Sequence, residues 1–320
     1  MSKEAMTMTN PERPTLATIE AARDRIRRAL RRTPVIAAEP ARVAPGAPDL
    51  LLKLECLQVT GSFKPRGALS KATTMAAGSV KGLITASGGN HGLGTAYAAR
   101  RLGLSCVVYL PESAPADKAE KLRAWGADVR THGAVWDESN AAALAAAETE
   151  DLAYIHAFAD PDVIAGQGTL ALEILEDTPE IETLIVAVGG GGLIAGVVTA
   201  AKALNPGIRI IGVEPVGAPT HHASRAEGDL VTLGAITTRA GSLSPQRSEA
   251  LNFSIISELV DEIVLVDDDQ MTEAAQWLWS EFGVGTELAG AASLAAVMQG
   301  LATGDKPLAI VCGAGKDGLA

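Results

Sequence analysis

The stretch "LIVAVGGGGLIAGVVTAAKAL", residues 184–204, decides the fold. Residues 184–188 form a continuous apolar run, which is typical of a strand whose two faces are both covered. Four consecutive glycines follow, and a helix-like stretch rich in alanine begins at Gly192. A strand joined to a helix by so short a turn is the repeating unit of a parallel sheet with helices on its faces.

The same unit recurs along most of the chain. Strands are expected at residues 50–55, 81–87, 105–110, 127–132, 184–188, 208–214, 262–267 and 307–313. Helices are expected at residues 66–77, 91–102, 115–125, 137–149, 161–176, 192–204, 270–281 and 286–302. Because strands and helices alternate, the sequence predicts an α/β fold of open parallel sheets with helices on both faces. Residues 217–252 have the weakest pattern and are expected to loop over another part of the molecule.

The composition argues against a nucleic-acid partner. The 320 residues carry a formal net charge of −11 and only 3% of them are aromatic. Nucleic-acid sites need clustered Lys and Arg together with stacking rings. The basic run at residues 23–32 places Ile26 and Leu30 on the inner side of a helix. Its arginines are therefore interpreted as a solvated helix face.

Cysteine usage and the apolar pattern indicate a cytoplasmic protein. Cys56, Cys106 and Cys312 are widely spaced and form no CxxC pair, so neither a zinc site nor a disulfide framework is indicated. Residues 1–14 lack the apolar core of a secretory signal, and no apolar run is long enough to cross a bilayer. We therefore expect a soluble protein with no membrane partner.

Folds of this kind bind ligands at the carboxyl ends of their strands. The first loop in such a place is "TASGGNHGLG", residues 85–94, where a helix begins just after Ser87 and Asn90. Backbone N–H groups at a helix start attract anions, and these two side chains add donors, so the loop suits a carboxylate. An ordinary capped turn with a chance histidine explains the loop equally well.

The glycines at 189–192 form the second loop. Glycine lets several backbone N–H groups converge on a ligand, and a phosphate suits such a nest. A rival interpretation is a dinucleotide fingerprint, because Gly190, Gly192 and Ala195 fit G-x-G-x-x-A and Glu214 ends the next strand. That interpretation predicts a nicotinamide-dependent oxidoreductase, although such a fingerprint normally lies in the first strand–helix turn of a domain.

Two further segments complete a constellation. In "GSFKPRGAL", residues 61–69, Lys64 lies between an aromatic ring and a proline, neighbours that a solvated lysine does not need. In the loop 309–318, Cys312 is either a core thiol or a neutral partner for a ring nitrogen. Pyridoxal phosphate with a bound amino acid requires an amine, a phosphate nest, a carboxylate site and such a polar atom.

With these residues in place, the sequence resembles the fold-type II pyridoxal-phosphate enzymes of the threonine/serine dehydratase and serine racemase group. The segments that carry the resemblance cover nearly the whole chain in the family's order. They are "RTPV" (32–35), "LKLECLQVTGSFKPRGA" (52–68), "ASGGNHG" (86–92), "VGGGGLIAG" (188–196), "GVEP" (212–215), "ELAGAASLAA" (287–296) and "VCGAG" (311–315).

The resemblance implies a fold, a cofactor and a set of site residues. The fold would be like that of the tryptophan synthase β subunit, with a large cofactor-binding domain at 1–80 plus 160–320 and a small substrate-closing domain at 81–159. The implied state is a homodimer. The cofactor would be pyridoxal 5'-phosphate, contacted by Phe63, Lys64, Asn90, Gly189, Gly190, Gly191, Gly192, Leu193, Glu287 and Cys312. The substrate carboxylate would be contacted by Ser87, Asn90, His91 and Gly92.

Individual roles follow from the same resemblance. Lys64 would form the Schiff base with the cofactor and act as the base at Cα. Phe63 would pack on the ring, and Asn90 would contact the phenolic oxygen. The glycines and Leu193 would bind phosphate through backbone N–H groups. Cys312 takes the place where many relatives have Ser, and Glu287 matches a glutamate near the cofactor.

Two departures from the family favour elimination. Racemases place a Ser directly before the Gly-Asn-His, as a second acid/base on the face opposite the lysine, whereas this chain has Gly88. A neutral Cys312 would not hold the pyridine nitrogen protonated, which favours expulsion of a β-leaving group over transamination. We therefore expect β-elimination from a 3-hydroxy amino acid, with a 2-oxo acid and ammonia as products.

Alternatives remain open at this point. The substrate is expected to resemble threonine or serine, while a racemase activity, 3-hydroxyaspartate and an aryl-serine stay in view. Arg239, in the weakly patterned stretch, would serve a second substrate carboxylate or be simply exposed, and exposure is favoured. A non-catalytic amino-acid sensor with the same pocket is a further class.

A divalent or monovalent cation is weakly indicated. The resemblance would place it at Glu214, Ala218 and Thr220, but Thr220 is a poor ligand for a hard divalent ion. His221 and His222 are adjacent and are expected to be exposed rather than to share a metal. Because the chain ends soon after the Cys312 loop, no C-terminal regulatory domain is expected.

Overall fold

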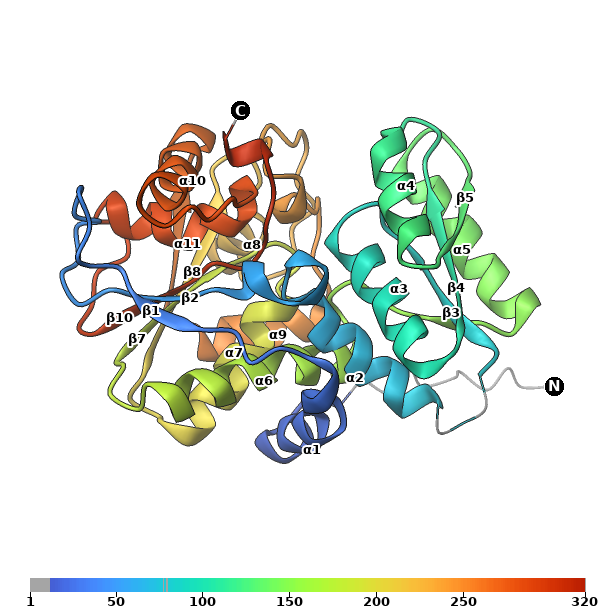
Figure 1. The fold of residues 1–320 in the computed structure, drawn as a ribbon, viewed down its shortest axis with the longest axis horizontal. Helices are drawn as coiled ribbons and strands as arrows, with labels where there is room; N and C mark the ends of the chain where they lie inside the picture. The colour runs from blue at the N-terminus through green and yellow to red at the C-terminus, as the bar shows by residue number, and fades with distance from the viewer. Residues whose placement is uncertain (1–11, 77, 79, 320) are drawn as a thin grey trace.

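The computed structural model describes residues 12–76, 78 and 80–319. Most of the N-terminal stretch considered above as a secretory signal, and residue 77 of the helix expected at 66–77, lie outside these residues. The chain forms two sheets, and Figure 1 shows the six-stranded sheet on the left and the four-stranded sheet on the right. Apart from one antiparallel pair, β1 with β2, every strand pair is parallel. The predicted α/β fold class is confirmed.

The larger sheet has the order β1-β2-β10-β7-β8-β9. Its strands are β1 (Val35–Ala37), β2 (Leu51–Lys53), β7 (Thr183–Ala187), β8 (Arg209–Pro215), β9 (Glu262–Val266) and β10 (Pro307–Ile310). Every residue of the central strands β7 and β10 is buried. Helices cover both faces of the sheet, which explains why its strands read as continuous apolar runs.

Two layers of helices pack on this sheet. Figure 1 shows α10 (Asp268–Phe282) and α11 (Leu288–Met298) above it, with α6 (Pro161–Asp177), α7 (Gly192–Leu204) and α9 (Ala250–Leu259) below. Local sequence sets where these helices begin. The Asp160 side chain accepts from the N–H groups of Asp162 and Val163, and Pro161 takes the first position of α6. The remaining helices of this part are α1 (Leu16–Ile26), α2 (Lys64–Ala76) and α8 (Thr220–Glu227).

The smaller sheet has the order β5-β4-β3-β6 and is parallel throughout. Its strands are β3 (Gly82–Ala86), β4 (Ser105–Leu110), β5 (Asp128–Thr131) and β6 (Ala153–Tyr154), and its helices are α3 (Asn90–Leu102), α4 (Ala116–Ala124) and α5 (Trp136–Glu150). Buried side chains of α5 pack with those of β3 and β4 in a small core of their own. These elements lie within the range 81–159, whose behaviour as a separate domain stays a prediction.

Each of the eight expected strands overlaps an observed one, while β1 and β6 were missed. These two strands have only three and two residues, too few to show a periodic pattern. The prediction of a plain loop at 217–252 is wrong in part, because α8 and the start of α9 lie there. In the basic run, α1 ends at Ile26, which is buried as expected, and a short 3₁₀ turn follows.

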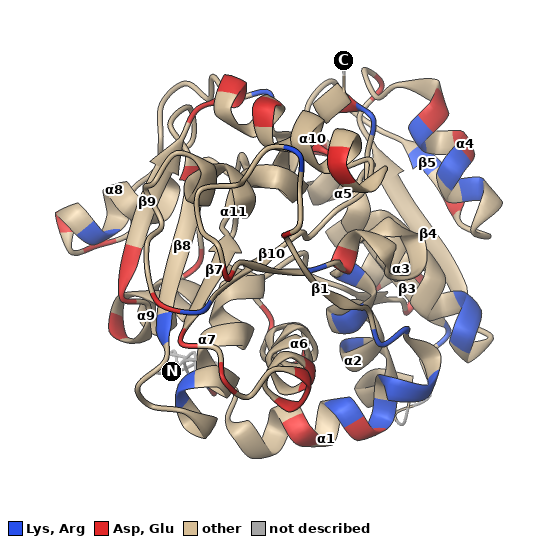
Figure 2. Cartoon of the chain, turned by 60° about the vertical axis from the view of Figure 1, so that its left-hand side comes forward, with Lys and Arg blue, Asp and Glu red and all other residues tan. Residues whose placement is uncertain are grey.

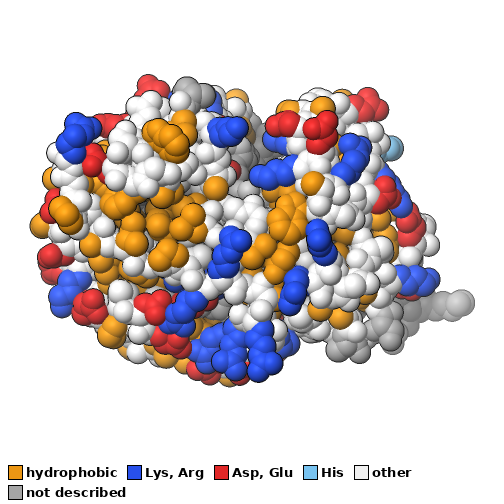
Figure 3. All heavy atoms as spheres, viewed as in Figure 1, with side chains coloured by type: hydrophobic (Ala, Val, Ile, Leu, Met, Phe, Trp, Pro, Cys, Tyr) orange, Lys and Arg blue, Asp and Glu red, His pale blue; other side chains and the backbone are white. Residues whose placement is uncertain are grey.

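Charged residues of both signs are distributed over the chain, and Figure 2 shows acidic and basic positions interspersed along α1. In Figure 3, basic side chains gather at the lower edge, where Figure 1 places α1. Several arginines of the basic run at residues 23–32 have acidic partners. Arg23 contacts Glu176 at 2.8 Å and Arg32 contacts Asp177 at 2.5 Å. None of the helices in the described ranges is both long and apolar enough to cross a membrane.

Candidate active site

One cavity collects residues from seven separate parts of the sequence. It lies beyond the carboxyl end of β7, at the start of α7, where parallel sheets bind their ligands. The ten residues that the family resemblance assigned to the cofactor all line it: Phe63, Lys64, Asn90, Gly189, Gly190, Gly191, Gly192, Leu193, Glu287 and Cys312. Five lining residues were not predicted: Phe158, Ala187, Ser242, Leu243 and Ala289.

Lys64 is the first residue of α2 and is held inside this cavity. Its Nζ donates to the carbonyl oxygen of Ala157 at 2.8 Å and lies 5.2 Å from the centre of the Phe63 ring. Burial lowers the pKa of Lys64 to about 8, opposed by the nearby Cys312 and Glu287. A larger fraction of this amine is therefore unprotonated at neutral pH than in a solvated lysine, which suits a nucleophile or a base.

The four glycines form a backbone turn with almost no room for side chains. Gly191 has a φ of +87°, in the left-handed region that favours glycine, and a Cβ on Gly190 would overlap the Phe158 ring. In the described chain, the backbone N–H groups of residues 189–194 donate to no other protein atom. Free N–H groups at the start of α7 make a nest that fits a phosphate, so the residues present suit the implied cofactor.

A hydrogen bond between Asn90 and Glu287 links the part of the chain with the smaller sheet to the part with the larger sheet, beside the cavity. Asn90, at the start of α3, donates through Nδ2 to Glu287 Oε1 at 2.7 Å. Ser242 Oγ donates to the other carboxylate oxygen at 3.3 Å. Burial, assisted by the charge of Asp317, raises the pKa of Glu287 to about 7. This carboxyl therefore changes protonation state near neutrality, within reach of Asn90.

Cys312 presents a neutral thiol to the cavity. Its Sγ donates to the carbonyl oxygen of Ala289 at 3.4 Å, and burial raises the pKa of the thiol. An un-ionised thiol cannot hold a neighbouring ring nitrogen protonated as a carboxylate does. The neutral state that the sequence analysis assumed for Cys312 agrees with its surroundings.

The expected carboxylate-binding residues other than Asn90 do not line the cavity. The His91 ring is buried and donates from Nε2 to the carbonyl oxygen of Ile155 at 2.9 Å. Burial, then the charge of Lys64, lowers its pKa to about 3, so the ring is neutral. Ser87 Oγ accepts from the N–H of Gly89 at 3.4 Å. The roles of Ser87, His91 and Gly92 toward a substrate stay predictions.

The segment 155–160, between β6 and α6, supplies functional neighbours that the sequence analysis missed. His156 Nδ1 accepts from the N–H groups of Phe158 at 3.2 Å and Ala159 at 2.8 Å, which shapes the turn that presents the Ala157 carbonyl to Lys64. Phe158 packs against the glycine turn. The one sequence signal for this loop was its position after a strand, where ligand sites are expected. That signal could not be used, because β6 has only two residues and shows no recognisable pattern.

Glu214 is used inside the protein rather than at a ligand. It is fully buried, and its two oxygens accept from the N–H groups of His221 and His222, each at 2.8 Å, at the start of α8. Burial raises the pKa of Glu214 to about 8. A buried helix cap leaves no path to a ribose, which removes the main support for the dinucleotide interpretation.

The residues expected around a cation do not fit one. Thr220 Oγ1 donates to the carbonyl oxygen of Pro245 at 2.7 Å, and the two oxygens of Glu214 already have donors. In the described residues, no group of three or more His, Cys, Asp or Glu side chains is placed to hold a metal. The expectation that both histidines are exposed is wrong for His221, which is fully buried, and right for His222.

Arg239 is exposed, as the sequence analysis favoured. It is engaged on the surface by Asp268 and Asp269, with N–O distances of 3.4 Å to each. The guanidinium therefore faces acidic partners of α10 and not the lining of the cavity. This arrangement removes the support for a substrate with a second carboxylate.

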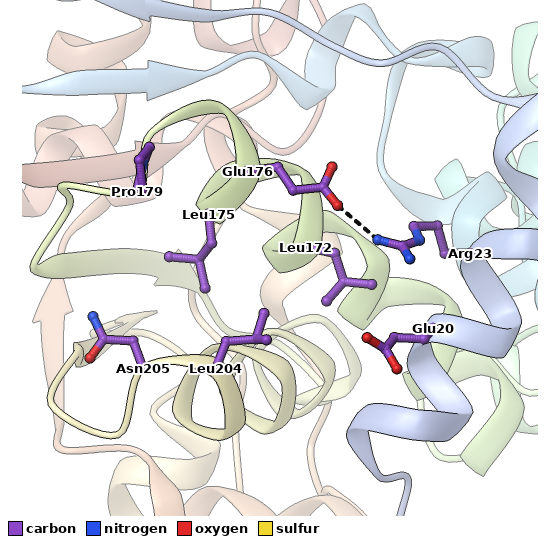
Figure 4. A pocket seen from close by; sticks show the side chains of 8 residues that line it. All are labelled: Glu20, Arg23, Leu172, Leu175, Glu176, Pro179, Leu204 and Asn205. Atoms are coloured by element: carbon purple, nitrogen blue, oxygen red, sulfur yellow. Dashed lines mark hydrogen bonds and ion pairs between the residues drawn. The ribbon is translucent and has the colours of Figure 1, made fainter.

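A larger surface hollow of about 340 Å³ lies elsewhere, beside α1, α6 and the end of α7. Figure 4 shows Leu172, Leu175 and Leu204 at its apolar side and the Arg23–Glu176 ion pair at its rim. Its lining contains no lysine, cysteine or histidine that would act as a nucleophile or base. The smaller cavity at the glycine turn is therefore the candidate active site.

Comparison with known proteins agrees with this geometry. The family described as "Pyridoxal-phosphate dependent enzyme" matches residues 26–313. The chain is 41% identical over 281 residues to L-threonine ammonia-lyase of Geobacter sulfurreducens, covering 88% of this chain and 70% of that protein. It is 35% identical over 281 residues to serine racemase of Oryza sativa subsp. indica, covering 88% and 82%.

Solved structures show the same similarity in three dimensions. The structure of maize serine racemase superposes with a TM-score of 0.89 at 33% sequence identity, covering 94% of each chain. The similarity thus extends over both sheets and includes lyases and racemases alike.

Proposed function

The chain belongs to the family of pyridoxal-phosphate-dependent enzymes, and from this premise we propose that it is a dehydratase, an ammonia-lyase acting on a threonine- or serine-like 3-hydroxy amino acid. The products are a 2-oxo acid and ammonia. The observation that carries the proposal is the single cavity in which a desolvated Lys64 faces a glycine nest, Asn90 and the neutral Cys312.

The chemistry divides between the cofactor and the protein. Pyridoxal phosphate, when bound, withdraws electrons from the Cα of an attached amino acid and so makes the Cα proton acidic. Lys64 is the residue that takes this proton, and its pKa of about 8 keeps part of the amine free to do so near neutral pH. The Cα–H bond breaks, Cβ loses hydroxide, and the released aminoacrylate hydrolyses to the oxo acid and ammonia.

Other residues hold the reactants in place. Backbone N–H groups of Gly189 to Gly192 and Leu193 would bind the phosphate, and Phe63 would pack beside the ring. Asn90, which Glu287 holds by a hydrogen bond, would contact the phenolic oxygen. The substrate carboxylate lies at the start of α3, where it meets Ser87, the N–H of His91 and Gly92 rather than the buried His91 ring.

Gly88 favours elimination over racemisation. Inversion at Cα requires a proton donor on the face opposite Lys64, and a glycine has none to give. A Cβ at residue 88 would lie 3.1 Å from Leu110 Cδ2 and 3.5 Å from Lys118 Cδ, so this position is lined by side chains of the smaller sheet and α4.

The quaternary state and location complete the proposal. The enzyme is a homodimer, as the family resemblance implies, and works in the cytoplasm, which agrees with three buried free cysteines, Cys56, Cys106 and Cys312. Light scattering of the purified protein tests the dimer; a monomeric mass would contradict it.

The deciding experiment measures products from a panel of substrates. The purified enzyme with pyridoxal phosphate is given L-threonine, L-serine, 3-hydroxyaspartate and phenylserine, and oxo acid and ammonia are quantified. A chiral assay measures D-serine formed from L-serine. We expect oxo acid from threonine or serine and little D-serine, with all turnover lost in Lys64→Ala. Dominant racemisation, or oxo-acid release by Lys64→Ala, would contradict the proposal.

A further inference from the structure

The outer side of the glycine turn is held by two buried side chains that have no assigned role, Ser248 and Asn252. We propose that they are positioning residues for the cofactor's phosphate: they hold the Gly190 carbonyl away from the cavity and thereby direct the N–H of Gly191 toward the anion. This inference rests on the proposed function, because it assumes that the nest binds the cofactor.

Both side chains donate to the same carbonyl oxygen. Asn252 Nδ2 lies 2.7 Å from Gly190 O, and Ser248 Oγ lies 3.1 Å from it. Asn252 Nδ2 also reaches the carbonyl oxygen of Phe158 at 3.2 Å. One amide group, on the first turn of α9, thus ties the glycine turn to the segment that packs against it.

The surroundings of Asn252 indicate that its nitrogen is the functional end. Both neighbours are carbonyl oxygens, which only accept hydrogen bonds, so the amide NH₂ must face them. The opposite end, Oδ1, is buried and has no hydrogen-bond partner in the described part of the chain. Burying an unsatisfied oxygen destabilises the protein, and an apolar side chain of similar size would avoid that cost.

Peptide geometry links these bonds to the cavity. In a planar trans peptide, the C=O of one residue and the N–H of the next point in opposite directions. The Gly190 carbonyl points toward Ser248 and Asn252. The N–H of Gly191 therefore points the other way, toward the cavity that Gly189 to Gly192 line.

Glycine makes this external support necessary. A peptide between Gly190 and Gly191 has no Cβ on either side to restrict its rotation, so its N–H is poorly oriented unless something holds it. The His221 ring also packs against this turn, since a Cβ on Gly191 would lie 2.7 Å from its Nε2. Orienting the donor before the anion arrives removes an ordering cost from binding.

The test compares cofactors with and without the phosphate. Apo protein is titrated with pyridoxal phosphate and with pyridoxal, and the ratio of the two affinities is measured for wild type, Asn252→Asp and Ser248→Ala. Asn252→Asp keeps the size but replaces the donor by an oxygen that repels Gly190 O. We expect its affinity for pyridoxal phosphate to fall about tenfold or more, with pyridoxal binding unchanged, and a smaller loss of the same kind in Ser248→Ala.

A matched control comes from the same helix. Ser254 donates to the carbonyl oxygen of Leu251 at 2.8 Å, does not line the cavity and, in the described chain, has no hydrogen bond to the glycine turn. Ser254→Ala removes the same hydroxyl group as Ser248→Ala, and we expect it to leave the ratio unchanged. Inorganic phosphate added as a competitor gives a second measurement. It should inhibit the binding of pyridoxal phosphate more strongly in wild type than in Asn252→Asp.

The outcomes separate the two proposals. Equal loss of affinity for both cofactors, or no loss for either, would overturn the positioning role. If Asn252→Asp does not fold, as circular dichroism would show, Ser248→Ala alone decides, and an unchanged ratio overturns the role. A wild type that binds pyridoxal as well as pyridoxal phosphate would instead contradict the phosphate nest and the proposed function.

Discussion

Lys64 shows how a single residue's surroundings set its chemistry. The amine is withdrawn from water, donates to one backbone carbonyl and has Phe63 at its side, and no carboxylate forms an ion pair with it in the described structure. Desolvation without full charge compensation disfavours the protonated form. The same arrangement leaves the amine reactive at a pH where exposed lysines are inert.

This environment predicts how cofactor attachment depends on pH. Only the unprotonated amine attacks an aldehyde, so the attachment rate should rise as pH increases through the pKa of Lys64, about 8. Stopped-flow absorbance of apo protein mixed with pyridoxal phosphate, from about pH 6 to pH 10, measures the profile. A model peptide with one lysine serves as control. A midpoint near the peptide's own value, about 10.4, would contradict the prediction.

Gly190 offers a second test at this scale. A Cβ there would overlap the Phe158 ring, which borders the same cavity, so the glycine turn and the ring must separate in Gly190→Ala. We expect pyridoxal phosphate to bind at least tenfold more weakly, measured by absorbance titration. Gly241→Ala, where a Cβ would meet nothing within 4 Å, is the control. Unchanged binding in Gly190→Ala would show that cofactor binding does not need the close packing of Gly190 against the Phe158 ring.

At the scale of elements, the start of α8 explains why Glu214 completes a dinucleotide-binding motif in the sequence but is not available to a ligand in the structure. Glu214, the last residue but one of β8, lies where a ribose or cation ligand was considered, yet its oxygens accept from the N–H groups of His221 and His222 in the first turn of α8. The oxygens of a carboxyl group at a helix start accept from N–H groups that would otherwise be unpaired. The acid is therefore a structural link between a strand and the helix that follows it.

This link predicts indifference to divalent cations. With Thr220 bonded to Pro245 and Glu214 capping α8, added Mg²⁺ or Ca²⁺ has no suitable ligand set at this loop, and the described residues hold no other group of metal ligands. Oxo-acid production should be the same after dialysis against EDTA and after addition of either metal, and the melting temperature should not shift. Activity that EDTA removes and Mg²⁺ restores would contradict this account.

At the scale of the whole molecule, a buried ion cluster ties three parts of the chain together near Lys64. Arg66 is 1% exposed and contacts Glu55 at 2.7 Å and Glu173 at 2.8 Å. Lys53, also buried, contacts Glu173 at 3.2 Å. Burial by itself would raise the pKa of Glu55, but Arg66 holds this pKa below its ordinary value. The cluster joins α2, which carries Lys64, to α6 and to the segment after β2.

Removing the arginine should therefore cost more than losing an ordinary ion pair. Arg66→Met leaves Glu55 charged and buried without its partner, and we expect a loss of about 3–5 kcal/mol in the free energy of unfolding at neutral pH. Glu55 has a depressed pKa in the native protein, so its contribution to stability is present above its unfolded pKa and is lost as pH falls.

In Arg66→Met the pKa shift of Glu55 should change direction. Without the arginine, burial dominates and raises the pKa of Glu55 above its ordinary value. The variant should thus lose less stability relative to wild type at about pH 5 than at pH 7, and adding Glu55→Gln should recover part of the loss. Denaturant unfolding measures each value. Arg130→Met, which removes surface pairs with Glu150 and Asp128, is the control and should cost less than about 1 kcal/mol. Equal losses in both variants would refute the special role of burial.

The sequence by itself determined the features that are encoded over short distances. Apolar runs and alanine-rich stretches located eight strands and the helices between them, since burial on both faces leaves its mark on consecutive residues. The glycine turn and the segment around Lys64 are motifs of adjacent residues, and they indicated the family and the ten residues that line one cavity. The short strands β1 and β6 escaped because two or three residues show no period, and α8 and α9 escaped because they lie in or at the end of the weakly patterned stretch 217–252.

Only the tertiary structure decided which distant groups meet. Asn252 and Gly190 are 62 residues apart in sequence, and Asn90 and Glu287 are 197 apart, yet each pair shares a hydrogen bond. Burial of His221, capping by Glu214 and the pairing of Arg239 with α10 likewise depend on how elements pack. The physical reason is that a side chain's solvation, pKa and partners are set by its neighbours in space, and no local pattern records them.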